Sequence, residues 1–566
     1  MKKLRWQLII ILLTGLVVGV LLVTQQQTKS SALPSVPQPS VGGIYTEGLI
    51  GSYQRFNPLL DIFNPPDRDV DHLLFSGLIR FDSRGVPQPD LADSWGISKD
   101  GTIYNFSIRS GMTWHDGKPL TTDDVLFTIE LMRNADQIVP ADLQKFWKDV
   151  DVKRLSETVL QFRLPEPYAP FLDYLSFGVL PKHLLGNIPA DQVVNAPFNM
   201  QPVGSGPYRF DHLVVENNQV QGVALTAYDK YFGKKPYISQ VIFRYYPDSK
   251  TVYQAYQQGQ IMGISQITAD LLPKAMVEPN LSLYTARQPE LALILFNLKN
   301  DSVPFLKTAD IRRAFLMGLN RQWLIDHILN GQAIQADGPL FPGTWAYFDG
   351  IQRVSFDPET AKELIKKAGY TFRAEGDAVR TDKEGKQLAF HLVYPDEPAY
   401  KAIAEQIQKN WADLGAKVDL EALPYDQLIS ERLEQHNYEA ALVSLNLSHS
   451  PDPDPYPFWD QAQAANGQNY TQWNNRNASE YLERARTTVD QAERLKGYRN
   501  FQVIFAQELP ALPLFYPVFT YAVDKQVQGV QLGPLIEPSD RLNALNTWFL
   551  IAKRNPAEKP TATPTK

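Results

Sequence analysis

The stretch LADSWGISKDGTIYNFSIRSGMTWHDGKPLTTDDV, residues 91–125, carries the strongest structural signals in this chain. Polar and apolar side chains alternate from residue 103 to residue 109, and this period of two predicts a half-buried strand. Asp100-Gly101 precedes that strand and Asp116-Gly117 follows it. Both dipeptides favour tight turns, because glycine accepts positive φ and aspartate bonds its own backbone.

A helix is predicted directly after the second turn. Thr121 or Thr122 can cap it, and Asp123 and Asp124 lie near its positive end. The segment therefore reads as strand, turn, strand, turn and helix. His115 beside Asp116 could form an acid–base pair, but no nucleophile motif accompanies it, so we expect His115 only to position the loop.

The same stretch closely resembles the signature segment of the family 5 solute-binding proteins, which serve peptide and nickel ABC transporters. Gly204-Ser-Gly-Pro-Tyr208 is similar to the family's Gly-Thr-Gly-Pro-Tyr turn, and residues 467–469 are similar to its Gly-x-Asn segment. The resemblance covers about residues 43–549. It implies a protein that captures oligopeptides outside the cytoplasm and delivers them to a membrane permease, without catalysis.

The resemblance also implies the fold class: α/β, with the two-lobe architecture of periplasmic binding proteins (class II type, cluster C) and an extra β-rich subdomain. Two crossings, near residues 286–291 and 509–517, would form a hinge that lets the lobes close over a ligand. The predicted division is a transmembrane anchor or signal (1–24), a linker (25–42), lobe I (43–72), its inserted subdomain (73–200), lobe I again (201–288), lobe II (289–508), the return to lobe I (509–553) and a disordered tail (554–566).

Local patterns support an α/β second lobe independently. Residues 291–297 are a continuous apolar run, typical of a fully buried strand. Asp357-Pro358 is a clear helix start, and from there helices alternate with strands. We also expect a helix over residues 310–329, a mostly helical segment over residues 480–506, and a strand over residues 150–164.

The N-terminus has the pattern of an export signal. Lys2, Lys3 and Arg5 precede an uncharged run over residues 6–24, whose length lies between a signal peptide and a membrane span. We favour an uncleaved single-span anchor over a cleaved signal. The basic end would stay in the cytoplasm, and the body would lie in the periplasm or on the outer face of the cell membrane.

Length and composition narrow the functional classes. A chain of 566 residues is too long for one core. The net charge is -7, or about -10 once the three basic residues of the N-terminal pattern are set aside, which argues against nucleic acid as a partner. There is no cysteine, which excludes disulfides, thiolate metal sites and a bacterial lipoprotein anchor. We expect a monomer whose partners are a ligand, a permease and, through its N-terminal helix, the membrane.

Enzyme and metal motifs are missing from the sequence. None of the eight histidines lies four residues from another, so no zinc-binding helix of the His-Glu-x-x-His type exists. No complete phosphate-binding loop and no Gly-x-Ser-x-Gly elbow occurs. We therefore expect no cofactor, no metal and no catalytic residue, and a secreted hydrolase is the weakest alternative.

Residues 448–460 form a proline-rich loop after a predicted strand, where α/β lobes commonly bind ligands. Its carboxylates lie beside aromatic residues, a pattern that suits a cationic solute; alternatively both aspartates only cap turns. The family holds the amino terminus of a peptide with an acidic residue in this loop, but Pro451 or His449 occupies that position here. Asp452 is the candidate substitute, and the departure leaves an oligosaccharide, another solute or a sensor role open.

The predicted ligand-binding residues come from four loops that the resemblance or the residue pattern places at the cleft. These are the first loop of the body, an aromatic loop near residue 345, the acidic loop and the polar-aromatic loop that follows it. The ten residues are Tyr53, Phe56, Asn57, Trp345, Asp452, Asp454, Tyr456, Trp459, Tyr470 and Trp473.

Overall fold

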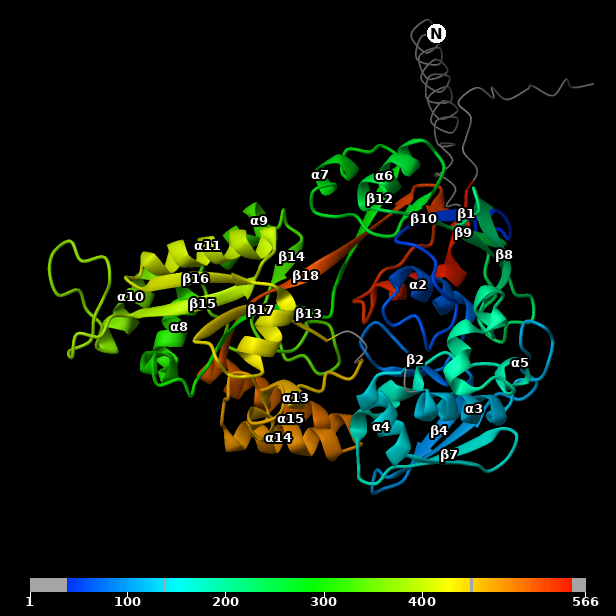
Figure 1. The fold of residues 1–566 in the computed structure, drawn as a ribbon, viewed down its shortest axis with the longest axis horizontal. Helices are drawn as coiled ribbons and strands as arrows, with labels where there is room; N and C mark the ends of the chain where they lie inside the picture. The colour runs from blue at the N-terminus through cyan, green and yellow to red at the C-terminus, as the bar shows by residue number, and fades with distance from the viewer. Residues whose placement is uncertain (1–37, 136–138, 448–450, 552–566) are drawn as a thin grey trace, which may run out of the picture. The chain divides into compact units, whose positions relative to one another are not determined.

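The computed structural model describes residues 38–135, 139–447 and 451–551. Its largest sheet has twelve strands, and one half of this sheet belongs to lobe I (Figure 1). In this half β1 pairs in parallel with both β10 and β11, while β8 and β9 extend the edge as an antiparallel hairpin. The strands are β1 (Ile44–Ile50), β8 (Tyr208–Glu216), β9 (Gln219–Ala227), β10 (Gln240–Tyr246), β11 (Gly263–Ile264) and β12 (Leu281–Arg287).

The other half of the sheet belongs to lobe II and mixes parallel and antiparallel strand pairs. Strand β15 lies between β16 and β17 and runs parallel to both, and α11 (Pro398–Ala412) connects β15 to β16. This is the βαβ arrangement that the sequence predicts. The strands are β13 (Glu290–Phe296), β14 (Ala333–Gln335), β15 (Ala389–Pro395), β16 (Lys417–Leu423) and β17 (Ala440–Asn446). The prediction of a buried strand is confirmed in β13, where every residue from Leu291 to Phe296 is buried.

Strand β18 (Ala511–Asp524) joins the two halves. Its first part pairs with β13 and β14, and residues 518–524 pair with β12 in lobe I. Strands β12 and β13 are separated only by Gln288 and Pro289. The chain therefore passes twice between the halves, near residues 287–290 and within β18. The two-lobe α/β fold that the resemblance implies is present.

A separate β-rich unit follows the first helix, α2 (Pro65–Leu74). It has a four-stranded antiparallel sheet, a short hairpin and two helices around its own core, which includes Trp114 and Trp147. Thr121 caps the first of these helices in a capping box with Asp124. The elements are β2 (Ile79–Phe81), β3 (Pro87–Pro89), β4 (Ala92–Ile97), β5 (Ile103–Ile108), α3 (Thr122–Asn134), α4 (Ala141–Asp149), β6 (Asp151–Arg154) and β7 (Val159–Arg163).

The two signature motifs meet at the end of α2. The backbone N–H groups of Ser205 and Gly206 donate to the carbonyl of Leu74, and a Cβ atom at Gly204 would lie 1.9 Å from that oxygen. His115 accepts the Gly204 N–H at Nδ1 (3.1 Å), and its Nε2 lies 3.0 Å from the Gly206 carbonyl. Burial lowers the pKa of His115 to about 4, so the ring is neutral and positions the loop, as expected.

Two predicted elements are divided in the structure, because capping or turn residues interrupt their patterns. Residues 150–164 form the hairpin β6–β7. Residues 310–329 form α8 (Ala309–Met317) and α9 (Arg321–His327), because Asn320 caps the second helix. The prediction that residues 480–506 are mostly helical is confirmed: they fall in α14 (Arg476–Thr487) and α15 (Gln491–Glu508), and Asp490 caps α15.

The predicted anchor (1–24), most of the linker and the tail (554–566) lie outside the described residues. Among residues 38–135, 139–447 and 451–551, no helix combines the length and the apolar character that a membrane crossing requires.

Candidate ligand-binding site

A cavity of about 830 Å³ is lined by residues of both lobes, the inserted subdomain and the first crossing. The crossing contributes Arg287, Gln288 and Pro289, so the cavity lies beside the predicted hinge. The loop after β17 contributes Pro451 to Pro455 and Pro457 to Trp459, and lobe I contributes α2 and the segment before it. A cavity of this volume is in the range of pockets that enclose a small ligand.

The acidic loop carries a buried ion pair. Both carboxylate oxygens of Asp452 accept hydrogen bonds from the guanidinium of Arg494, at 2.5 and 2.6 Å, and Tyr498 donates to one of them at 3.5 Å. The pKa of Arg494 is raised: burial alone would lower it, and the nearby Asp452 carboxylate outweighs that effect. Asp452 therefore already has a cation from its own lobe.

The second carboxyl group of the loop is also partnered. Asp454 lies 3.1 Å from Arg486, and the guanidinium of Arg486 lies over the ring of Tyr456 at 4.3 Å. The same guanidinium lies 5.1 Å from the ring of Tyr168, which belongs to the inserted subdomain. Burial raises the pKa of Asp454 to about 6, with Arg486 opposing the shift.

The inserted subdomain contacts lobe II at this loop. The backbone N–H of Asp452 donates to both carboxyl oxygens of Asp173, at 3.0 and 3.2 Å. The backbone N–H of Trp345 donates to the carbonyl of Arg84 at 3.0 Å. The cavity therefore has a second lobe-to-lobe contact in addition to the crossings. Burial and the neighbouring Asp452 raise the pKa of Asp173 well above its usual range.

The structure brings three of the ten predicted residues to the cavity wall: Asp452, Asp454 and Trp459. Tyr456 and Trp345 lie one layer behind it, next to the arginines that pair with the loop carboxylates. The guanidinium of Arg494 lies 5.0 Å from the ring of Trp345, which is itself buried. These two aromatic residues therefore support the ion pairs of the loop.

The other five predicted residues are not among those that line the cavity. Phe56 and Asn57 are fully buried in lobe I, and Asn57 donates to the side-chain oxygen of Asn199. Tyr53 packs on Phe56 with ring centroids 4.8 Å apart. In lobe II the Trp473 indole donates to Glu508 at 2.7 Å, and the carbonyl of Tyr470 accepts from Tyr438. Residues in loops after strands can pack against their own lobe instead of facing the cleft, and these five residues do so.

Sequence reasoning missed the lobe I side of the cavity. Asp61 and Asp71 line it, as do Glu537 and Asp540 of the return segment. The signal was the charged run DRDVDH at residues 67–72, which is dense in acidic groups for a helix that must pack. Such a run usually marks a solvent-exposed face, and only the fold turns part of it inward.

One group of side chains among the described residues has the spacing of metal ligands: His72, Glu537 and Asp540. Each already has a protein partner. His72 Nε2 lies 2.8 Å from Asn543 Oδ1, Asp540 accepts two backbone N–H groups, and Glu537 lies 3.3 Å from Arg68. These contacts fit a hydrogen-bonded cluster.

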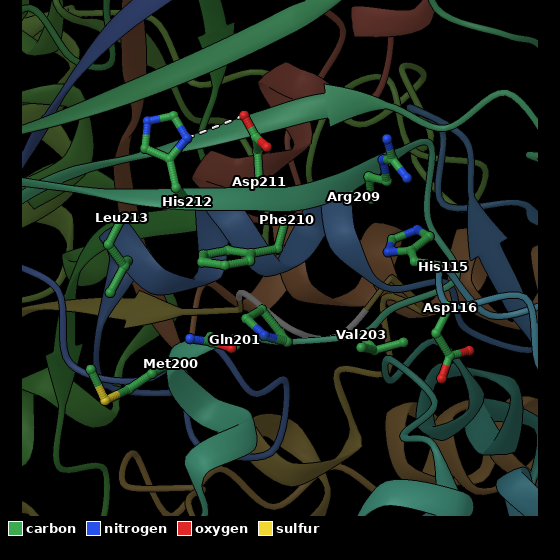
Figure 2. A pocket seen from close by; sticks show the side chains of 11 residues that line it. His115, Asp116, Met200, Gln201, Val203, Arg209, Phe210, Asp211, His212 and Leu213 are labelled. Atoms are coloured by element: carbon green, nitrogen blue, oxygen red, sulfur yellow. Dashed lines mark hydrogen bonds and ion pairs between the residues drawn. The ribbon is translucent and has the colours of Figure 1, made fainter.

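A second, smaller cavity of about 500 Å³ lies within lobe I and its subdomain. Figure 2 shows His115 and Asp116 at one side of it, and Phe210, His212 and Leu213 projecting from β8. Because none of the described residues of lobe II lines this cavity, we do not assign the ligand to it.

Comparison with known proteins places these features in a wider group. The family described as bacterial extracellular solute-binding proteins, family 5, matches residues 86–468, about two thirds of the chain. The oligopeptide-binding protein AppA of Bacillus subtilis is 27% identical over 534 residues, which cover 93% of this chain and 95% of AppA. The dipeptide-binding protein of Escherichia coli is 24% identical over 507 residues, covering 86% and 91% of the two chains.

Solved structures show the same fold. The structure of Bacillus subtilis AppA with a nonapeptide aligns with a TM-score of 0.64 at 26% identity, covering 91% of this chain and all of that one. HbpA2 from Haemophilus parasuis aligns with a TM-score of 0.76 at 21% identity, covering 90% of this chain and all of that one.

Proposed function

We propose that this chain, which belongs to the family 5 bacterial extracellular solute-binding proteins, captures oligopeptides between its two lobes and delivers them to an ABC permease. The observation that carries the proposal is the cavity of about 830 Å³ lined by both lobes and by the crossing between them. A ligand there would touch both lobes, so its binding free energy would favour their closed arrangement. The names of the relatives support a peptide as the ligand.

The cavity wall suits a peptide. Phe341, Pro342 and Trp459 give apolar surface, while Arg287 and Gln288 of the crossing supply polar groups. The wall thus combines apolar surface, which can cover a ligand, with polar and charged groups, which can orient it. We assign Trp459 to the apolar wall. Asp452 and Asp454 line the cavity and hold the proline-rich loop through their arginine partners.

The membrane arrangement is also part of the proposal. The charge and apolar pattern of residues 1–24 supports an uncleaved anchor that tethers a monomeric body outside the cytoplasm. We also propose the predicted division into lobes, with the inserted subdomain in lobe I and the return to lobe I within β18. The protein would change no bond in its ligand, because its relatives are named as binding proteins.

A thermal-shift screen tests the ligand class. Purified full-length chain would be heated with tri-alanine, with penta-alanine and with maltotriose, since a ligand that binds only the folded state raises the melting temperature. We expect peptides to raise it and maltotriose to leave it unchanged. Chromatography of the recovered peptide should show it intact. Stabilisation by maltotriose alone would favour the oligosaccharide alternative, and shortened peptide would favour a hydrolase.

A further inference from the structure

Two carboxyl groups lie together on the lobe I side of the cavity. Asp61 is in the loop before α2, Asp71 is on α2, and both line the cavity while only 8% and 3% of their surfaces are exposed. Neither oxygen of Asp71 has a hydrogen bond of standard geometry, although the Asp61 carboxyl and the Asn57 backbone N–H lie close enough to influence its pKa. Buried carboxyl groups normally have such partners, so Asp71 lacks a well-placed donor or cation.

The positive charges nearby do not balance this cluster. Arg68 lies 3.5 Å from Asp61 and 3.3 Å from Glu537, so one guanidinium serves two carboxyl groups. Arg541 is committed to Glu47 and Asp69 by bonds of 2.6–2.7 Å. Asp71 has no ion pair with an arginine or lysine among the described residues.

The electrostatics agree with this geometry. Burial raises the pKa of Asp61 to about 7 and that of Glu537 to about 8, and burial together with Asp61 raises the pKa of Asp71 well above its usual range. An incoming cation would reverse part of this cost, because it stabilises the ionised form. The titratable and charged groups that interact with the pair are Tyr53, Asp67, Arg68, Tyr245 and Glu537. Asp69, His72 and Asp540 lie beside Glu537.

The acidic loop of lobe II offers no comparable site. Asp452 and Asp454 each have an arginine from their own lobe, whereas in the lobe I pair Asp61 shares Arg68 with Glu537 and Asp71 has no ion pair with an arginine or lysine of the described residues. We propose that Asp61 and Asp71 form the subsite that binds an ammonium group of the ligand, either the amino terminus or a lysine side chain of the peptide. Asp61 contacts the ammonium group, and Asp71 supplies the second carboxyl behind it. This inference rests on the proposed function.

Isothermal titration of the full-length chain, stripped of ligand by unfolding and refolding, tests the subsite. The probes are tri-alanine, N-acetyl-tri-alanine and N-acetyl-Ala-Lys-Ala. The variants Asp61→Asn and Asp71→Asn keep side-chain shape and remove charge. Asp142→Asn removes a charge from an exposed residue of the same cavity wall and is the matched control. Melting temperatures verify that each variant is folded.

We expect the wild type to prefer one or both ammonium-bearing peptides over N-acetyl-tri-alanine by about tenfold or more, the range of a charged hydrogen bond. Asp61→Asn and Asp71→Asn should remove most of this preference, and Asp142→Asn should keep it. The preferred peptide identifies the source of the ammonium group. A preference that survives in both variants, or a wild type indifferent to the ammonium group, overturns the subsite.

Failure of the proposed function would look different. If no peptide binds, the proposal that the ligand is a peptide is contradicted. The subsite is then tested with the solute that co-purifies with the chain. A co-purified amine that is lost from Asp61→Asn and retained by Asp142→Asn supports the subsite on its own. A preparation with no co-purified solute, a solute without an ammonium group, or one that both lobe I variants retain overturns it.

Discussion

The guanidinium of Arg494 in α15 binds both carboxylate oxygens of Asp452, which lies 42 residues earlier in the chain, in the loop after β17. This pair fixes the loop whose backbone N–H then reaches Asp173 of the inserted subdomain. Asp452, which the sequence predicts as a ligand contact, therefore holds in place a loop that forms part of the cavity wall. The carboxyl groups available to a cationic ligand lie instead on lobe I.

Arg494→Ala should destabilise the chain strongly. Both partners are nearly buried, with 7% and 9% of their side-chain surfaces exposed, and the substitution leaves an uncompensated carboxylate. The expected loss of unfolding free energy is about 3–5 kcal/mol, measured by urea denaturation. Arg484→Ala is the control, because that side chain is 74% exposed and only 3.8 Å from its acidic partner; it should change stability by less than about 0.5 kcal/mol. Equal effects of the two substitutions would contradict a buried structural pair.

Gly204→Ala should disrupt the contact between the signature turn and α2. Its Cβ atom would lie 1.9 Å from the Leu74 carbonyl oxygen, and backbone must move to relieve that overlap. We expect a loss of about 1–3 kcal/mol or more in unfolding free energy. Gly96→Ala meets no atom within 4 Å and should be nearly neutral. Chemical denaturation of both variants measures these changes. If Gly204→Ala leaves the free energy of unfolding unchanged, the turn is not held tightly against the Leu74 carbonyl.

Asp90→Asn should change how stability depends on pH. Burial raises the pKa of Asp90 to about 7, so the folded state holds this proton more tightly than the unfolded state. The wild type therefore loses stability as pH rises from about 4 to about 7, and the loss is complete above pH 7. Asp90→Asn cannot ionise and should be more stable than the wild type by roughly 2–4 kcal/mol at pH 8, with little difference at pH 4.

Denaturation curves at several pH values test this expectation. The exposed Asp93→Asn on β4 is the control, and it should follow the wild type at every pH. If the difference in unfolding free energy between Asp90→Asn and the wild type does not grow between pH 4 and pH 7, ionisation of Asp90 does not destabilise the folded state.

Local sequence predicted much of the fold. The run of apolar residues in β13 has no polar position to expose, so its burial followed from composition alone. Asp357 was recognisable as a helix cap, and it accepts the Thr360 N–H in the structure. Interior caps were harder to see, because Asn320 and Asp490 interrupt helical patterns without a proline or a change in periodicity.

The site was less predictable, because its side chains meet through tertiary contacts. Nothing local to Asp452 indicates that Arg494 will neutralise it. Trp473 lies in a polar loop, where an aromatic residue is expected to stack on a ligand, yet its indole N–H donates a hydrogen bond to Glu508. Asp71 looks like a solvent-exposed helical residue, and only the packing of α2 beside the return segment buries it.

Native mass spectrometry of the purified full-length chain tests the central claim most directly. We expect one intact peptide with a free ammonium group bound to each chain, released on unfolding and unchanged in mass after long incubation with the refolded protein. A chain that carries only sugars or other non-peptide solutes, or one that shortens the added peptide, would contradict it.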